Sequence, residues 1–291
     1  MTLRVRWLGR VPYREALALQ EGLFAHGTDR HLLLLEHPHV FTHGARADVA
    51  ANLHVDPASV GAELVAVNRG GDVTYHGPGQ LVGYPIVDVP NPLAASDHVC
   101  TIQRLVVSVL TRLGVADVGC LPEYPGVWVG VSSPTPRKIC AIGVKIGHRR
   151  GDEASESPRG RTMHGFALNV STDLTYMRDH IVPCGIAHLP VTSIAEEGVE
   201  VSMREVVDLI VAEAALLWGD GSVERQDTAW KQRPEDLSPF SRGEGAGTPV
   251  RAAGEHFAPA QPTAVSVSPP TSRAAARLEQ AGVTGGLEVS T

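Results

Sequence analysis

The chain has 291 residues, of which 43% are hydrophobic, a content typical of a globular protein with a sizeable core. Its formal net charge of −7 argues against a nucleic-acid partner, because non-specific binding needs a basic surface that displaces counterions from phosphates. The N-terminal residues lack the apolar region of a signal peptide, and no apolar run approaches the roughly 18 residues of a membrane span. We therefore expect a cytoplasmic protein without a membrane segment.

The N-terminal part of the chain predicts two strands around one helix. Residues 3–8 are expected to form the first strand. A helix is predicted between Pro12 and Gly27, because Pro suits a first helical turn and apolar residues then recur at helical spacing. Residues 32–35 are a continuous apolar run, which is typical of a buried strand.

Three histidines follow that run, at His37, His39 and His43. Such a group invites a metal interpretation. The sequence favours a loop of ordinary histidines, because no cysteine or carboxylate completes a ligand set and Pro38 breaks any helix that would align them. We expect no metal site here.

The most informative stretch is 69–80, which reads Arg-Gly-Gly-Asp-Val-Thr-Tyr-His-Gly-Pro-Gly-Gln. A glycine pair, a short alternating segment and a Gly-Pro-Gly turn follow one another. Glycines are useful where the backbone must approach a ligand closely. Residues 81–89 then form a second strand, and two strands joined by a tight turn predict an antiparallel hairpin.

The middle of the chain predicts one helix and three strands. The helix is expected to begin at an N-cap, Asp97, and to end at Gly114, with Cys100 packed on it. The strands are predicted at 126–130, 138–146 and 162–170. Between the last two lies a polar, highly charged insertion at 148–161.

A last strand at 191–194 and a helix from the N-cap Ser202 to Trp218 complete the predicted domain, residues 1–220. Residues 221–291 are rich in Pro, Gly, Ala and Ser, so we expect this tail to be largely disordered or loosely docked. Strands in hairpins with helices between them indicate an α+β fold, a mixed, mostly antiparallel sheet flanked by helices.

Residues 69–80 resemble the signature of the lipoyl(octanoyl) transferases, which share a fold with the lipoate and biotin protein ligases. The pattern Arg-Gly-Gly, two residues, Thr-Tyr-His, two residues, Gly-Gln is far more specific than a short glycine motif. Residues 36–44 are similar to the family's Glu-His-Pro-x-Val-x-Thr-x-Gly loop, and 138–143 to its Lys-Ile-x-x-Ile/Leu-Gly segment. The resemblance covers roughly residues 33–218, and the 148–161 insertion departs from it.

Cys184 is the candidate nucleophile. Pro183 and Gly185 deny it a regular helix or strand, so we expect a turn with a reachable thiol. The resemblance implies that this cysteine carries the octanoyl group as a thioester and that Lys138 is its partner. A thiol needs such a cationic or basic neighbour, since its ordinary pKa is about 8.5.

Two residues compete with this pair. Lys145 lies on the same predicted strand as Lys138 at opposite parity, so it faces away provided that no bulge intervenes. Cys140 shares the parity of Lys138 and competes as nucleophile. Its apolar neighbours favour a buried, inert thiol, and the four cysteines contain no Cys-x-x-Cys pair.

The resemblance implies an acyltransferase that moves the octanoyl group from octanoyl-acyl carrier protein to the lysine of lipoyl domains. The implied acceptors are the 2-oxoacid dehydrogenase E2 subunits and the glycine cleavage H protein, and no ATP or other cofactor is expected. We expect a monomer. The implied walls of the acyl site are Arg69, Gly70, Gly71, Asp72, Val73, Thr74, Tyr75, His76, Ala141, Ile142, Gly143, Gly165, Phe166 and Ala167.

Several roles stay open from the sequence. His76 and His164 either orient groups and handle protons or merely hold loops in place. Backbone N–H groups of Gly70, Gly71 and Gly77 are candidates for an oxyanion site. Either a positive docking face or a solvated charged hairpin accounts for the basic residues Arg137, Lys138, Arg149, Arg150, Arg159 and Arg161.

Three other functions compete with octanoyl transfer. An ATP-dependent lipoate or biotin ligase shares the fold and the lysine but does not need Cys184. A cysteine-using amidotransferase would move the acyl group between two lipoyl-type proteins. From a different class, an acyl-binding or carrier-docking protein would bind without turnover.

Overall fold

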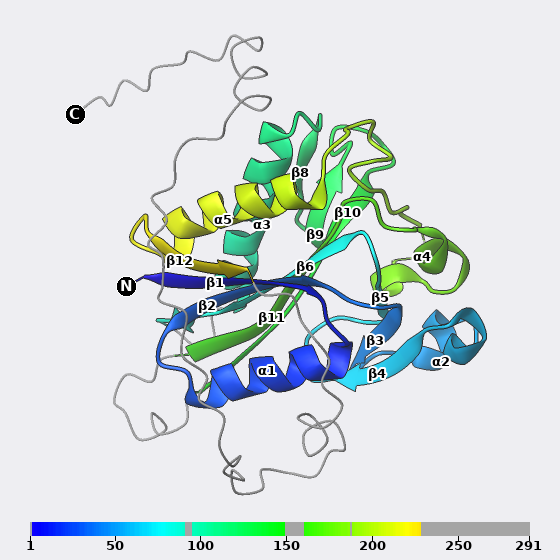
Figure 1. The fold of residues 1–291 in the computed structure, drawn as a ribbon. Helices are drawn as coiled ribbons and strands as arrows, with labels where there is room; N and C mark the ends of the chain where they lie inside the picture. The colour runs from blue at the N-terminus through cyan, green and yellow to red at the C-terminus, as the bar shows by residue number, and fades with distance from the viewer. Residues whose placement is uncertain (1, 91–94, 149–159, 187, 228–291) are drawn as a thin grey trace, which may run out of the picture.

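The computed structural model describes residues 2–90, 95–148, 160–186 and 188–227, and a nine-stranded sheet dominates this part of the chain (Figure 1). Two pairs, β12–β1 and β1–β2, are parallel and the other pairs are antiparallel, which confirms the predicted α+β class. The short β7 (Asp88–Val89) lies beside β11. The other strands follow in the order β12 (Val223–Asp227), β1 (Leu3–Arg10), β2 (Arg30–Glu36), β6 (Gln80–Ile86), β11 (Gly160–Asn169), β10 (Arg137–His148), β9 (Tyr124–Val129) and β8 (Val118–Leu121).

Helices cover both faces of this sheet, with α1 (Tyr13–His26) on one and α3 (Ala95–Arg112) and α5 (Met203–Trp218) on the other (Figure 1). Strand β2 shows why its sequence is apolar throughout. Leu32 and Leu34 join the core under α3 and α5, whereas Leu33 and Leu35 join the core under α1. A strand that is buried on both faces reads as a continuous hydrophobic run.

A smaller sheet packs beside the main one and contains β4 (Glu63–Val67), β3 (Val40–Gly44) and β5 (Thr74–His76). Strand β3 pairs in parallel with β4 and antiparallel with β5. Helices α2 (Val49–Asn52) and α4 (Thr175–Asp179) and the 3₁₀ turns η1 (Pro57–Val60) and η2 (Pro183–Gly185) complete the described elements. Thus part of the expected 36–44 loop is a strand.

The predicted hairpin around the Gly-Pro-Gly turn is wrong. Strand β5 pairs with β3, whereas β6 pairs with β2 and β11, so the turn carries the chain from the small sheet to the main sheet. The N–H of Gly79, whose φ is +79°, donates to the Glu36 carboxylate at 2.6 Å. This contact to a third segment replaces the ladder that a hairpin would have made.

Three local predictions also need correction. Asp97 lies inside the first turn of α3, which begins at Ala95, and Cys100 is exposed on that helix instead of packed. Residues 191–194 form no strand; Val191 makes a single bridge to Lys138. By contrast, Ser202 caps α5 as predicted, in a capping box with Glu205.

Strand β12 pairs with β1 at 223–227, beyond the limit of residue 220 that the sequence predicts for the catalytic domain. Most of the predicted insertion (149–159) and the rest of the predicted tail (228–291) lie outside the described residues. Within the described residues, no helix is both long and apolar enough to cross a membrane.

Candidate active site

A cavity of about 540 Å³ is lined by residues of β5, β6, β10 and β11, by the 69–72 turn and by the turn that carries Cys184. This volume lies within the roughly 300–1,000 Å³ that small-molecule sites occupy. Both members of the predicted pair, Cys184 and Lys138, line it. Of the predicted wall residues, all except Val73 and Tyr75 line it too, as does His164.

Val73 and Tyr75 point away from the cavity, because side chains alternate along β5 and the segment before it. Both pack in a separate apolar cluster under the small sheet. The Tyr75 hydroxyl lies 2.7 Å from His39 Nδ1, and its ring stacks on Tyr176 at 4.7 Å. Their place in the signature is therefore structural.

Sequence reasoning missed part of the lining, which includes Tyr13 from α1, Val82 and Tyr84 from β6, and Tyr124 and Ile186. The signal for Tyr84 was present in the sequence. Alternation along β6 from the Gly-Pro-Gly turn places Val82 and Tyr84 on one face, the face that α1 covers.

The 69–72 turn is braced by its own arginine. The Arg69 guanidinium donates to the Thr42 carbonyl and hydroxyl oxygens at 2.9 Å and to the Asp72 carbonyl at 3.0 Å. The Gly70 N–H donates to the Val144 carbonyl at 3.3 Å, so this expected oxyanion donor is already engaged. Gly77, the third candidate, packs against Tyr75 and is not part of the lining.

The turn η2 holds Cys184 in a left-handed conformation, with φ of +56°. Such a φ is strained for a residue with a Cβ, so the surroundings must fix it. The Cys184 N–H donates to the Val73 carbonyl at 2.9 Å, and the Val182 N–H donates to the Asn52 carbonyl at 2.9 Å. The Asn52 side chain in turn donates to Asp72 at 2.9 Å. The turn that carries the half-buried thiol is thus anchored to the residue before β5 and to the end of α2.

A bulge in β10 turns Lys138 toward the cavity. Lys138 is opposite Trp128 on β9 and Cys140 is opposite the next residue, Val127, so Ile139 is the extra residue. Ile139 and Cys140 both pack in the core under α3 and α5. Cys140 therefore faces away from Lys138, which corrects the predicted shared parity. Its complete burial raises the pKa of the thiol, as an inert cysteine requires.

The same bulge corrects the prediction for Lys145. Beyond it, Ala141 and Gly143 lie on the face of β10 that Lys138 presents, and Lys145 shares that face; Ile142 and Val144 line the cavity as well. Lys145 lies farther along the strand, with its Nζ 5.6 Å from the centre of the Phe24 ring of α1. It is not among the cavity-lining residues.

Both cavity histidines are buried and neutral at pH 7. Burial lowers the pKa of His76 well below its ordinary value, and its Nδ1 lies 2.8 Å from Gln80 Oε1. Burial also lowers the pKa of His164 to about 3, and its Nε2 lies 3.0 Å from Asn68 Oδ1. These environments favour holding roles over proton transfer.

The histidines of the 36–44 segment serve the fold. His37 Nδ1 lies 2.7 Å from the Val11 carbonyl oxygen and its Nε2 lies 2.8 Å from the Tyr84 hydroxyl. His39 contacts Tyr75. Among the described residues, no group of three or more His, Cys, Asp or Glu side chains could hold a metal ion.

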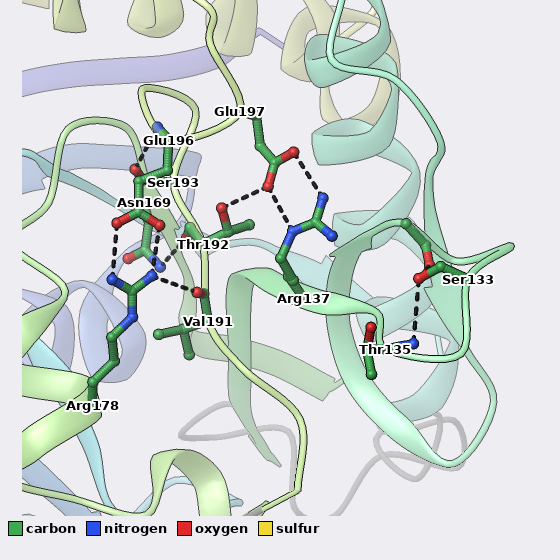
Figure 2. Close-up of polar contacts among 11 residues, drawn as sticks. Ser133, Thr135, Arg137, Asn169, Arg178, Val191, Thr192, Ser193, Glu196 and Glu197 are labelled. Atoms are coloured by element: carbon green, nitrogen blue, oxygen red, sulfur yellow. Dashed lines mark hydrogen bonds and ion pairs between the residues drawn. The ribbon is translucent and has the colours of Figure 1, made fainter.

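The loop 190–197 is fastened to the start of β10 through Arg137 (Figure 2). The Lys138 N–H donates to the Pro190 carbonyl at 2.8 Å, and the Thr192 N–H donates to the Lys138 carbonyl at 2.9 Å. Arg137 binds the Glu197 carboxylate with two hydrogen bonds of 2.9 Å, and Thr192 Oγ1 donates to it at 2.6 Å. The loop that follows Cys184 is thereby tied to the strand that carries Lys138.

The described basic residues do not support a positive docking face, one of the two alternatives that the sequence leaves open. Arg137 is paired with Glu197, and Lys138 is only 5% exposed. Arg161 is fully buried in β11, where it binds Asp88 at 2.6 Å and the Asp29 carbonyl. The other three residues of that proposed face, Arg149, Arg150 and Arg159, lie outside the described residues.

Residues 12–215 match the family model of the lipoyl protein ligase A/B catalytic domain. The chain belongs to this family of enzymes. An octanoyltransferase of Solibacter usitatus is 45% identical over 209 residues, which cover 69% of this chain and 86% of that protein. An octanoyltransferase of Acidothermus cellulolyticus is 43% identical over 209 residues, covering 70% and 86%.

Solved lipoate protein ligases share the fold. A bipartite lipoate protein ligase from Thermoplasma acidophilum has a TM-score of 0.63 at 19% identity and covers 84% of this chain and 95% of that one. A lipoate-protein ligase A bound with ATP has a TM-score of 0.61 at 19% identity, covering 85% and 97%. At this identity the likeness concerns the fold alone.

Proposed function

We propose that this protein transfers an octanoyl group to the lysine of a lipoyl domain through a thioester on Cys184. The observation that carries the proposal is that Cys184 and Lys138 line one cavity. The curated relatives, which are octanoyltransferases at 43–45% identity, support the acyl group and the reaction class.

The reaction has two halves. In the first, the Cys184 thiolate attacks the thioester carbonyl of octanoyl-acyl carrier protein, and the carrier leaves as a thiolate that takes up a proton. In the second, the lysine amine of the acceptor attacks the acyl-enzyme, loses a proton and releases Cys184. Lys138, the basic residue that lines the cavity together with Cys184, passes the proton between these steps.

The cavity suits the acyl chain. Its walls include the side chains of Val82, Ala141, Ile142, Phe166 and Ala167. Each buried CH₂ of an acyl chain contributes about 0.8 kcal/mol of binding free energy. His76 and His164 orient the surrounding loops in this scheme, consistent with their lowered pKa values.

The proposed acceptors are the lipoyl domains of 2-oxoacid dehydrogenase E2 subunits and the glycine cleavage H protein. The exchange of one thioester for another is near thermoneutral and the step from thioester to amide is downhill, so the reaction needs no ATP. We further propose that the protein acts as a monomer in the cytoplasm.

The test is the intact mass of the protein after incubation with octanoyl-acyl carrier protein without ATP. We expect one octanoyl adduct on the wild type, its absence from Cys184→Ser, and its discharge by a lipoyl domain. Modification of the lipoyl domain only when ATP and free octanoate are supplied would instead identify a ligase. An adduct that only a lipoylated or octanoylated protein can supply would identify an amidotransferase, and binding without turnover would identify a docking protein.

A further inference from the structure

The ammonium group of Lys138 lies over an aromatic ring. Its Nζ is 4.8 Å from the centre of the Trp128 ring, within the roughly 6 Å at which a cation is attracted to the ring face. Lys138 is 5% exposed and Trp128 is fully buried. Because water is largely excluded, this attraction is stronger than a similar contact on the surface.

The surroundings fix the ring and leave room for the lysine. Trp128 lies opposite Lys138 in the β9–β10 pair, and its indole N–H donates to the Tyr124 carbonyl at 3.2 Å. Gly126, with φ of +136°, lies beside the lysine stem, where an added Cβ would be 3.3 Å from Lys138 Cε. The bulge at Ile139 completes the arrangement by turning the lysine toward the ring and the cavity.

In the part of the chain that the structure describes, no carboxylate binds the Lys138 ammonium beside the Trp128 ring. There, Lys138 Nζ makes no ion pair within 4.0 Å and no hydrogen bond, although Glu123 lines the same cavity. An ion pair would occupy N–H donors of the ammonium and hold its proton. A ring face attracts the charge without accepting a conventional hydrogen bond, so the three N–H groups remain available to reacting atoms.

We propose that Trp128 is a positioning residue, which holds the Lys138 amine in the cavity through its ring face. Trp128 itself does not line the cavity, so it acts only through the lysine. The catalytic importance of this arrangement rests on the proposed function, in which Lys138 assists Cys184.

The kinetic test compares Trp128→Phe, which keeps a ring, with Trp128→Met, which fills space without one. The readout is the rate of octanoyl adduct formation on Cys184, measured by intact mass at matched temperatures below each melting point. We expect Trp128→Phe to retain the rate within about three-fold and Trp128→Met to lose about ten-fold. Equal rates in the two variants would overturn the proposal.

Phe24→Leu is the matched control, because it removes the ring beneath Lys145, the lysine that does not line the cavity. We expect its rate to equal that of the wild type. Lys138→Met separates this inference from the proposed function. If Lys138→Met is fully active, the role of Lys138 in the proposed function fails. If it is impaired while Trp128→Met is not, only the present inference fails.

A spectroscopic test examines the contact in the wild-type protein directly. The sequence has three lysines, Lys138, Lys145 and Lys231, so ¹³Cε-labelled lysine gives few signals that Lys→Arg variants assign. Protons over a ring face are shifted upfield. We expect the ε-protons of Lys138 to be shifted upfield in the wild type and the shift to shrink in Trp128→Met. A Lys138 signal at the position of a solvated lysine would overturn the proposal.

Discussion

One residue, Ile139, decides whether Lys138, Cys140 and Lys145 share a face of β10. Without the extra residue, Lys138 and Cys140 would share a face and Lys145 would oppose them. With it, Cys140 enters the core and Lys138 enters the cavity. The motif identified Lys138 as a candidate, but parity counting placed its neighbours wrongly, because no residue type in this apolar run marks the bulge.

Cys140 provides a test of this placement. We expect Cys140→Ala to form the octanoyl adduct at the wild-type rate, because the buried thiol has a raised pKa and faces away from the cavity. The change should lower the free energy of unfolding by about 1–2 kcal/mol through the small cavity it leaves. Intact mass measures adduct formation and urea denaturation measures the free energy of unfolding. Loss of the adduct with an intact fold would contradict the placement of Cys140 in the core.

A substitution at Gly83 tests the opposite effect, in which an added side chain overpacks the core instead of leaving a cavity. A Cβ at Gly83 would collide with the ring of Phe166, a wall residue of the cavity. We expect Gly83→Ala to destabilise the fold by roughly 1–3 kcal/mol, as measured by urea denaturation.

Gly22→Ala is the control for that measurement. Gly22 lies in α1, and nothing lies within 4 Å of the position that an added Cβ would occupy. Because alanine favours a helix over glycine, this variant should gain about 0.5–1 kcal/mol. Changes of the same sign at both positions would contradict the packing described here.

At the level of elements, the 190–197 loop follows the Cys184 turn in the chain and is hydrogen-bonded to β10, the strand that carries Lys138. Hydrogen bonds from Arg137 lower the pKa of Glu197 below its ordinary value. A lowered carboxyl pKa adds stability that is present above the unfolded value and is lost as the pH falls through the folded value. The Arg137–Glu197 ion pair, which we call the clamp between β10 and the 190–197 loop, is therefore weaker in acid.

Glu197→Gln tests this clamp. We expect a loss of about 1 kcal/mol at pH 7, a modest figure because the Arg137 side chain is 38% exposed and solvent screens the pair. The difference from the wild type should shrink as the pH falls through the lowered Glu197 pKa. Urea midpoints of the wild type and the variant from pH 7 to pH 3 measure the loss at pH 7 and its decrease in acid. The more exposed pair Arg178–Glu196 supplies the control, since Glu196→Gln should cost less.

The elements differ in how well the sequence predicts them. Periodic apolar residues predicted α1, α3 and α5, with Ser202 as the N-cap of α5, and apolar runs predicted β2, β10 and β11. The Gly-Pro-Gly turn was misread, because a local turn signal does not specify which strands its two ends join. Strand β12 escaped prediction, because Val-Glu-Arg-Gln-Asp carries one apolar residue and depends on its pairing with β1.

For the whole molecule, β12 matters because it covers the edge of the main sheet. It pairs with β1 over Leu3–Trp7, and its Glu224 forms ion pairs with Arg4 and Arg6. We expect a chain ending at residue 222 to melt several degrees below a chain ending at 227 and to self-associate, because an uncovered β1 edge is a template for further strands. Equal melting temperatures and elution volumes would show that β12 is dispensable.

The two proposed catalytic groups belong to different sheets. The Cys184 turn is hydrogen-bonded to Val73, next to β5 of the small sheet, and to Asn52 of α2, whereas Lys138 lies in β10 of the main sheet. The distance between the Cys184 thiol and the Lys138 amine therefore depends on how the two sheets pack against each other. A slight sliding of one sheet would misalign sulfur and amine while leaving each hydrophobic core intact. Gentle heating should therefore abolish turnover before the circular dichroism spectrum changes, and the first damage should be reversible on cooling.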